Sequence, residues 1–165
     1  MKNTIRLALL AAVAVSGFWL WTVIFPSPEK VVRQIIASVA TTATVRAGDS
    51  NITRAAKATN LTVFFADDAQ VILEVAGQAS HTLSGRDEIR ETALGGFASL
   101  TSLKVQFLDV TVRIGADKQT AEVSCTARVS AGDNKDFGVQ EMHFQMKKTD
   151  GTWRITRAET VKTLS

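Results

Sequence analysis

The longest uncharged run in the chain is the feature that most limits what it can fold into. Residues 7–25, LALLAAVAVSGFWLWTVIF, contain no charged side chain. At an α-helical rise of about 1.5 Å per residue, the run would span about 28 Å, close to the hydrocarbon thickness of a bilayer. Pro26 and Pro28 follow it and would end a helix. We therefore expect an N-terminal tail over residues 1–6, a transmembrane helix over residues 7–25, and a separate domain over residues 26–165.

Two fates of this helix remain open. Lys2 and Arg6 precede it, as in the positive start of an export signal, so it is either a cleaved signal peptide or a retained anchor. Cleavage after the small residues at 12–14 would leave an apolar core of about seven residues, the lower limit for a signal peptide. The aromatic side chains in FWLWTVIF lie where the far headgroups would be. We expect a retained single-pass signal-anchor; secretion after cleavage and a helix buried in a globular core are the alternatives.

Flanking charges indicate the side of the membrane on which the domain lies. Lys2 and Arg6 stand before the span, whereas Lys30 and Arg33 after it are partly offset by Glu29. By the positive-inside bias, the N-terminus is expected in the cytoplasm. The domain is then extracytoplasmic, which means periplasmic in a bacterium.

Charge and ligand patterns exclude several function classes. The chain has 19 basic and 16 acidic residues, but Lys2 and Arg6 precede the uncharged run and every acid follows it. Beyond the run the basic residues exceed the acids by only one and form no stripe typical of nucleic-acid binding. The single cysteine, Cys125, allows no intramolecular disulfide. His81 and His143 lack metal-ligand spacing, and no phosphate loop appears, so we expect no metal, no cofactor and no nucleic-acid partner.

Three helices are predicted after Pro26. Ser27-Pro28-Glu29 combines an N-cap, a proline in the first helical turn and an acid, and the helix that begins there is expected to break at Gly48. Asp49 or Ser50 would cap a second helix running to about Phe65. In SGRDEIRETALGGFASL, capping-box spacing predicts the start of a third helix.

Strands are predicted between the second and third helices and from Ser102 onward. The apolar period changes from about 3.6 to 2 at Val71 and Leu73, with a short return strand beginning near His81. Four long alternating runs then follow, separated by turn residues. These elements predict an α+β fold in which a curved antiparallel sheet packs on three helices. The apolar residues expected to share faces are Val110, Val112 and Ile114; Val123, Cys125, Ala127 and Val129; Met142, Phe144 and Met146; and Trp153 and Ile155.

Three short motifs occur in an order that resembles a known superfamily. FFADDAQV closes the second predicted helix, SGRDEIR opens the third, and DGTWRI starts the last strand. Over about residues 28–163 this arrangement resembles the nuclear transport factor 2-like superfamily, which includes SnoaL-like cyclases, ketosteroid isomerase and many members that are not enzymes. The resemblance implies a cone-shaped domain with a cavity between sheet and helices. It also implies a homodimer formed through the sheet.

The resemblance to ketosteroid isomerase does not extend to its catalytic positions. The position of the general base matches Leu73, and the tyrosine of the oxyanion hole would lie near Thr41 or Thr42, although the chain contains no tyrosine. The position of the protonated acid matches Gln140, which can donate a hydrogen bond but is no acid. We therefore expect no chemistry of the steroid-isomerase type.

The adjacent carboxylates Asp67 and Asp68 have a structural interpretation. In the superfamily a similar pair belongs to the turn between helix and strand. Aspartate can accept hydrogen bonds from backbone amides there and tolerates irregular backbone. We expect this pair to turn the chain and not to act as an acid and a base.

Arg157 and Glu159 are the first candidates for binding in the cavity. By strict alternation they share a face with Trp153 and Ile155, which would carry them into the wide end of the cavity. The alternative is a mutual or neighbouring salt bridge at the rim of the sheet, which we favour.

His81 and Gln140 complete the set of cavity-binding candidates. His81 is expected in or beside the short second strand near the cavity mouth, with a surface histidine as the commoner alternative. His143 is expected to face solvent or a dimer partner, and Cys125 to be a small core residue.

The expected function is therefore a membrane-tethered domain that binds an apolar small molecule or a protein partner without catalysis. The alternative is a small-molecule isomerase, dehydratase or cyclase of SnoaL-like type that uses polar groups at the cavity mouth.

Overall fold

The computed structural model describes residues 27–74, 80–132 and 134–161, with side chains described outside residues 134–137. The predicted tail and the predicted transmembrane helix over residues 7–25 lie outside these ranges, so the expected anchor is without support from the structure. Within the described ranges, no helix has both the length and the apolar composition needed to cross a membrane.

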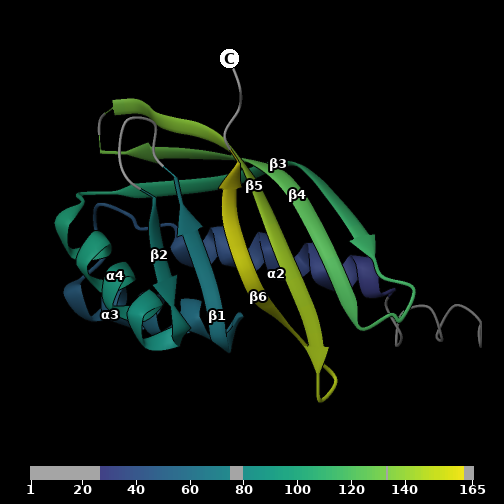
Figure 1. The fold of residues 1–165 in the computed structure, drawn as a ribbon. Coiled ribbons are helices and arrows are strands. Elements are labelled where there is room, and N and C mark those ends of the chain that lie inside the picture. Colours follow the sequence, from purple (N-terminus) through teal and green to yellow (C-terminus); the bar gives the residue numbers. More distant parts are fainter. Residues whose placement is uncertain (1–26, 75–79, 133, 162–165) are drawn as a thin grey trace, which may run out of the picture.

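Three helices pack on a curved six-stranded sheet, as expected from the sequence (Figure 1). They are α2 (Pro28–Ala43), α3 (Asn51–Thr62) and α4 (Gly85–Ser99).

The helix starts agree with their capping signals. The Ser27 hydroxyl accepts a hydrogen bond from the Lys30 amide at 3.4 Å, and the Ser50 hydroxyl accepts one from the Thr53 amide at 3.2 Å. At the start of α4 the Glu88 carboxylate instead accepts from the Ser84 amide at 2.7 Å. The sequence therefore places all three helix starts correctly.

The sheet has the order β2-β1-β6-β5-β4-β3. Its strands are β1 (Phe65–Leu73), β2 (His81–Ser84), β3 (Leu103–Ile114), β4 (Thr120–Ala131), β5 (Asn134–Thr149) and β6 (Thr152–Val161). All neighbours are antiparallel except β1 and β6, which pair in parallel. The predicted all-antiparallel sheet is wrong at this pair, because the meander β3 to β6 ends with its last strand running in the direction of β1.

The two aspartates lie in a strand and not in the expected turn. Helix α3 ends at Thr62 and β1 already begins at Phe65. The pairing of β1 with β6 shifts register between Phe65 and Gln70, so Asp67 and Asp68 occupy an irregular stretch of β1. The Asp67 carboxylate pairs with the Arg86 guanidinium of α4 at 2.6 Å. The expected turn is therefore wrong, and Asp67 has an arginine as its partner in place of a backbone amide.

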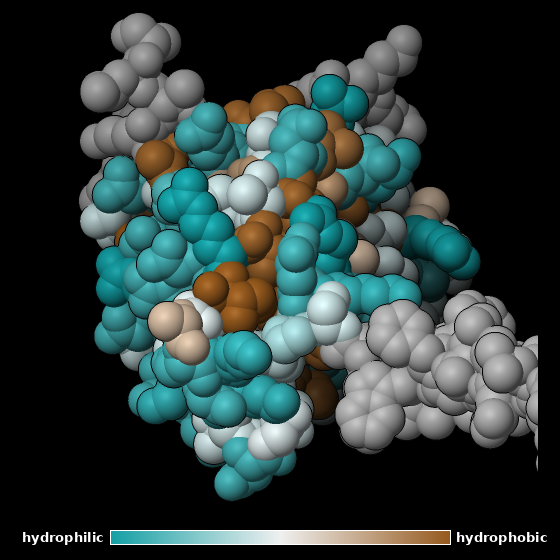
Figure 2. Space-filling model, turned by 90° about the vertical axis from the view of Figure 1, so that its right-hand side faces the viewer, coloured by the Kyte–Doolittle hydropathy of each residue, from teal (hydrophilic) through white to brown (hydrophobic). Residues whose placement is uncertain are grey.

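Two apolar clusters form the core. The larger one joins α2 and α4 to the inner face of the sheet, and it includes an edge-to-face contact between Phe107 and Phe144 with ring centroids 5.5 Å apart. The smaller cluster, formed by Val45, Ala58 and Phe97, lies between α3, α4 and the chain after α2. Figure 2 shows the side of the molecule at the start of α2 and the β3–β4 hairpin, where apolar side chains are framed by hydrophilic ones.

Candidate functional site

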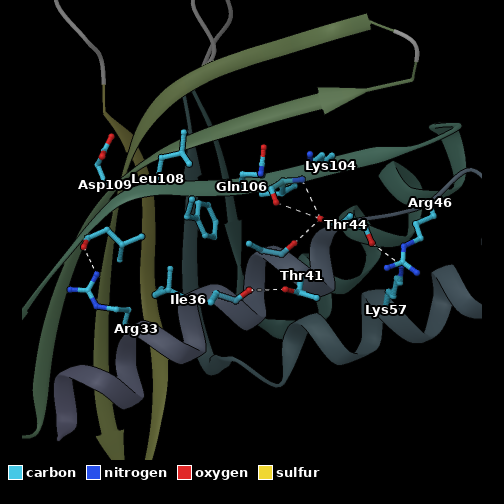
Figure 3. A pocket seen from close by; sticks show the side chains of 15 residues that line it. Arg33, Ile36, Thr41, Thr44, Arg46, Lys57, Lys104, Gln106, Leu108 and Asp109 are labelled. Carbon is cyan, nitrogen blue, oxygen red and sulfur yellow. Dashed lines mark hydrogen bonds between the residues drawn. The ribbon is translucent and has the colours of Figure 1, made fainter.

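A groove of about 860 Å³ runs between α2 and the edge strand β3 (Figure 3). It exists because α2 crosses a strand that has a sheet neighbour on one side only. Its lining residues are Arg33, Ile36, Ala37, Ala40, Thr41, Thr44, Arg46, Lys57 and residues 104–110. The volume lies in the range of small-molecule sites.

The free edge of β3 supplies backbone groups to this groove. Leu103 exchanges two backbone hydrogen bonds with Val45, at 2.7 and 2.8 Å, on the side away from β4. The Val105 amide points the same way and donates to the Thr44 hydroxyl at 3.2 Å. By the alternation of an antiparallel pair, the backbone N–H and C=O of Phe107 face this edge too. Among the described residues no group caps them, so the middle of the groove keeps an open backbone edge.

A β-bulge closes one end of the groove. The pairing of β3 with β4 shifts between Leu108 and Thr111, and Asp109 there adopts a left-handed backbone with φ 52°. Aspartate tolerates this conformation better than most residues. The bulge turns the Val110 carbonyl outward, where it accepts a hydrogen bond from the Arg33 guanidinium at 2.5 Å. Arg33 is also paired with Glu29 at 3.1 Å, so its charge is already balanced.

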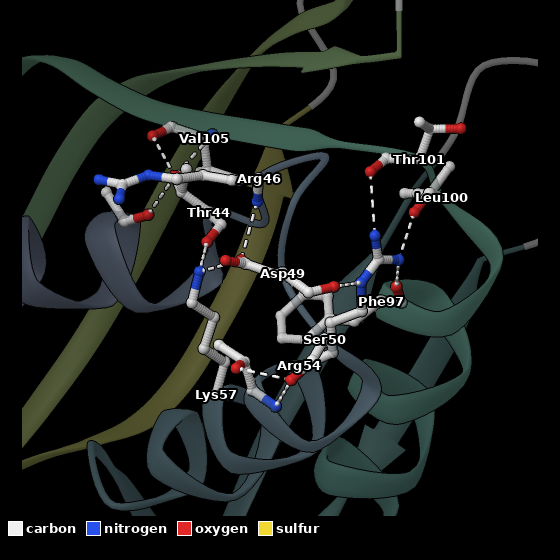
Figure 4. A network of polar contacts seen from close by, with 12 residues as sticks. Thr44, Arg46, Asp49, Ser50, Arg54, Lys57, Phe97, Leu100, Thr101 and Val105 are labelled. Carbon is white, nitrogen blue, oxygen red and sulfur yellow. Dashed lines mark hydrogen bonds and ion pairs between the residues drawn. The ribbon is translucent and has the colours of Figure 1, made fainter.

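The opposite end of the groove is positively charged (Figure 4). The Lys57 ammonium donates to the Thr44 carbonyl at 2.7 Å and to the Asp49 carboxylate at 2.5 Å. The hydrogen bond from Lys57, with a second one from the Arg46 amide, holds the pKa of Asp49 below its ordinary value. The side chains of Arg46 and Lys104 are exposed, and neither forms a salt bridge among the described residues, although the charge of Arg46 also acts on Asp49.

Apolar side chains form the floor of the groove between its two ends. Ile36 and Ala40 of α2 are buried, and Val105, Phe107 and Leu108 of β3 are half-buried. No histidine, cysteine or tyrosine lines the groove within the described chain, and its one acid, Asp109, is exposed. This arrangement can hold an apolar body, but it offers no paired acid and base.

Arg157 and Glu159 lie on the outer face of the sheet, so the predicted shared face with Trp153 and Ile155 is wrong. The pairing of β5 with β6 shifts between Gln145 and Met146, which leaves Thr156 as an extra residue in β6. The alternation changes phase there, and Ala158 becomes the buried residue at 2 % exposure. The Arg157 guanidinium bonds the Glu159 carboxylate at 2.8 Å, the mutual salt bridge that we favoured from sequence.

The other two candidates do not line the groove either. Gln140 lies opposite Ala127, on the inner face of the sheet, and its amide donates to the Glu74 carbonyl at 2.7 Å. It therefore ties the end of β1 to β5. His81 is the exposed first residue of β2, opposite Leu73. The structure does not bring His81, Gln140 and the Arg157–Glu159 pair together at one cavity.

Two further residues lie where the sequence places them. His143 is exposed on the outer face opposite Ser124 and Glu159. Cys125 is buried in the main core, and burial raises the pKa of its thiol to about 11, which makes it a poor nucleophile at neutral pH.

Sequence reasoning named Thr41 only as the place of an absent tyrosine and missed the other residues that line the groove. Arg33, Ala37, Ala40, Thr41 and Thr44 recur at helical spacing on one face of α2, and this face is less apolar than the core face. That pattern alone indicates a solvated face. Only the position of the β3 edge beside it creates a site, and nothing in the sequence predicts which strand ends the sheet.

Comparison with known proteins identifies the kind of domain. A model of the SnoaL-like domain matches residues 39–159. No curated protein matches the sequence. Among solved structures, a nuclear transport factor 2-like protein with a cystatin-like fold from Novosphingobium aromaticivorans superimposes with a TM-score of 0.62 at 19% identity, over 92% of this chain and 88% of that one.

Two more solved structures from the same organism are similar in fold. One is assigned as a scytalone dehydratase. It has a TM-score of 0.58 at 15% identity, and the match covers 82% of this chain and 83% of that one. The other, assigned as an aromatic ring hydroxylase, has a TM-score of 0.60 at 15% identity, and the match covers 86% of this chain and 93% of that one. At these identities the likeness shows the fold alone.

Proposed function

This chain belongs to the SnoaL-like domain family, and from that premise we propose that its domain is a non-catalytic binding module for an apolar small molecule. The ligand lies in the groove between α2 and β3. The observation that carries the proposal is the groove itself, with a volume of about 860 Å³, an apolar floor and an open backbone edge at Phe107. Pockets of this kind hold a ligand by burial of its apolar surface and orient it with a few polar groups.

The enzymatic alternative has weaker support. An isomerase, dehydratase or cyclase needs an acid and a base within reach of one substrate. His81 and the Arg157–Glu159 pair lie on other surfaces of the domain, and the groove is lined by arginine, lysine and threonine in place of such a pair. Two neighbours in fold are assigned as enzymes, but fold does not carry function at this distance.

The setting of the binding module is part of the proposal. The uncharged run over residues 7–25 would tether the domain to a membrane with its groove on the extracytoplasmic side, or would direct secretion if it is cleaved. A homodimer through the sheet would use the outer face that carries His143 and the Arg157–Glu159 pair. That face is polar, so such a dimer would be a wet, hydrogen-bonded interface.

A tryptophan placed in the groove tests the proposal. Ala37 is an exposed groove residue on α2, so Ala37→Trp fills the space without entering the core. Ala55→Trp is the matched control, because Ala55 is an exposed alanine on α3 outside the lining. The full chain and both variants are extracted from cells in mild detergent and weighed by native mass spectrometry.

The proposal expects a small-molecule adduct on the wild type and on Ala55→Trp that is absent from Ala37→Trp. The same adduct on all three proteins would place the ligand elsewhere. An adduct with the mass of a protein would favour binding of a protein partner in place of a small molecule. A wild type without any adduct would count against a binding role for this groove.

A further inference from the structure

We propose that the ligand of the α2–β3 groove is an amphiphilic carboxylate, with its anionic head at Arg46 and Lys104 and its apolar body along α2. This inference rests on the proposed function and adds the chemical class and the orientation of the ligand. It is carried by the unequal charge at the two ends of the groove.

The end of the groove at Arg33 is electrostatically satisfied. The Arg33 guanidinium bonds the Glu29 carboxylate at 3.1 Å and the Val110 carbonyl at 2.5 Å, and the exposed acid Asp109 also lies at this end. An anionic group placed here would meet two carboxylates and a cation that is already engaged. This end therefore suits the uncharged tail of a ligand.

The end at Arg46 has unbalanced positive charge. Asp49 forms a salt bridge with Lys57 at 2.5 Å and also feels the charge of Arg46, but it is one carboxylate among three cations, and neither Arg46 nor Lys104 forms a salt bridge among the described residues. Figure 3 shows Arg46 and Lys57 near Thr44 on the α2 side of β3, Lys104 on the other side of that edge strand, and Arg33 at the far end of the groove. Both cations line this end of the groove, and the Arg46 guanidinium matches a carboxylate, which can accept two parallel hydrogen bonds from arginine.

The distance between the two ends matches a medium-length chain. Arg33 and Thr44 are eleven positions apart on α2 and its cap, and at about 1.5 Å per residue this corresponds to roughly 16 Å of groove. Between them the floor is formed by Ile36, Ala40 and Phe107, which can cover methylene groups. A linear carboxylic acid of medium chain length fits within this span, and the charge at the two ends sets its orientation.

Three ligands with one tail and different heads test the inference. Decanoate, decanol and decylamine carry a negative, a neutral and a positive head. Their binding to the full chain in phosphatidylcholine nanodiscs is measured by equilibrium dialysis, and binding to empty nanodiscs is subtracted. We expect decanoate to bind about tenfold more tightly than decanol, the range of a charge-assisted contact that is partly exposed, and decylamine to bind most weakly.

Two double variants separate the local charge from the net charge. Arg46→Gln with Lys104→Gln should abolish the preference, so that decanoate and decanol bind about equally. The affinity for decanol should stay unchanged. Arg90→Gln with Lys118→Gln removes the same charge from a half-buried and an exposed residue outside the groove lining and should keep the preference. An equal loss in both double variants would overturn the inference, because it would reflect the net charge of the domain.

The remaining outcomes distinguish this inference from the proposed function. If decanol binds as tightly as decanoate and Ala37→Trp abolishes both, the apolar site stands and the carboxylate assignment falls. If none of the three ligands binds, both proposals fail. If decanoate binding is lost in phosphatidylglycerol nanodiscs, anionic lipid headgroups compete for the two cations. That result would overturn a free carboxylic acid as the ligand.

Discussion

At the scale of single residues, Arg54 is the strongest polar link in the helical layer. Its guanidinium donates to four backbone carbonyls, those of Asp49 at 3.1 Å, Phe97 at 2.6 Å, Leu100 at 2.6 Å and Thr101 at 3.0 Å (Figure 4). Three of these lie at the end of α4, whose last turn has no basic residue of its own. Arg54 thus satisfies carbonyls that the helix itself cannot bond, and it ties α4 to the start of α3.

Replacing Arg54 by lysine should destabilise the domain by about 2 kcal/mol. Lysine keeps the charge, but its single ammonium cannot reach carbonyls on two sides, so half-buried acceptors lose their donors. Urea denaturation followed by circular dichroism measures the change. Arg90→Lys is the control, because Arg90 makes only an exposed pair with Asp87 at 3.1 Å, and we expect less than about 0.5 kcal/mol there. Equal effects of the two substitutions would contradict the role given to Arg54.

Cys125 should give the domain a stability that falls at high pH. Burial raises the pKa of its thiol from 9.0 to about 11, so between these values the unfolded chain loses a proton that the folded chain keeps. The contribution is fully present below pH 9 and is lost as the pH rises toward 11. Urea midpoints measured from pH 8 to 11 should decline less in Cys125→Ala than in the wild type. Parallel declines would mean that the thiol does not contribute.

At the scale of elements, one extra residue in β6 decides which side chains reach the core. The register shift opposite Gln145 and Met146 leaves Thr156 unpaired, and the residues after it change faces. Strict alternation would place Arg157 inward and Ala158 outward. A bulge gives no clear signal in a single sequence, because the pattern before it and the pattern after it each alternate correctly.

Two substitutions in β6 should show the change of face directly. Ala158→Arg places an unpaired charge in the core at a residue that is 2 % exposed, and we expect a loss of about 4 kcal/mol or failure to fold. Arg157→Ala removes a half-buried pair with Glu159 on the outer face and should cost at most about 1 kcal/mol. Denaturation of both variants measures the two values. The opposite ranking would restore the alternation predicted from the sequence.

At the scale of the whole molecule, the sequence predicts the domain better than the site. Periodicity and caps locate three helices and the strand-rich second half, because these signals are local and depend on burial of one face. The parallel β1–β6 pair and the groove arise from contacts between distant segments. Arg46 and Lys104 line one groove only because Val45 pairs with Leu103, and neither residue carries a motif that points to the other.

The two core clusters divide the molecule into parts of different size. The main cluster unites α2 with most of the sheet, whereas Val45, Ala58 and Phe97 form a smaller cluster under α3 and α4. Leu61 packs against both clusters and connects them. Because the smaller cluster buries few side chains, α3 and α4 should open more readily than the central strands.

Hydrogen exchange of the full chain should reveal this division. We expect amides in α3 and in the second half of α4 to exchange faster than amides in β4 and β5, since local opening there breaks mainly the smaller cluster, whereas Ile89 holds the start of α4 in the main one. Phe97→Ala should weaken that cluster by about 3 kcal/mol and raise exchange in α3 and α4 on the order of a hundredfold, with little change in β5. Phe144→Ala removes the same side chain from the main cluster and should raise exchange in every element together. If Phe97→Ala also acts on all elements equally, the domain opens as one unit, and the groove beside Lys57 is then as rigid as the sheet.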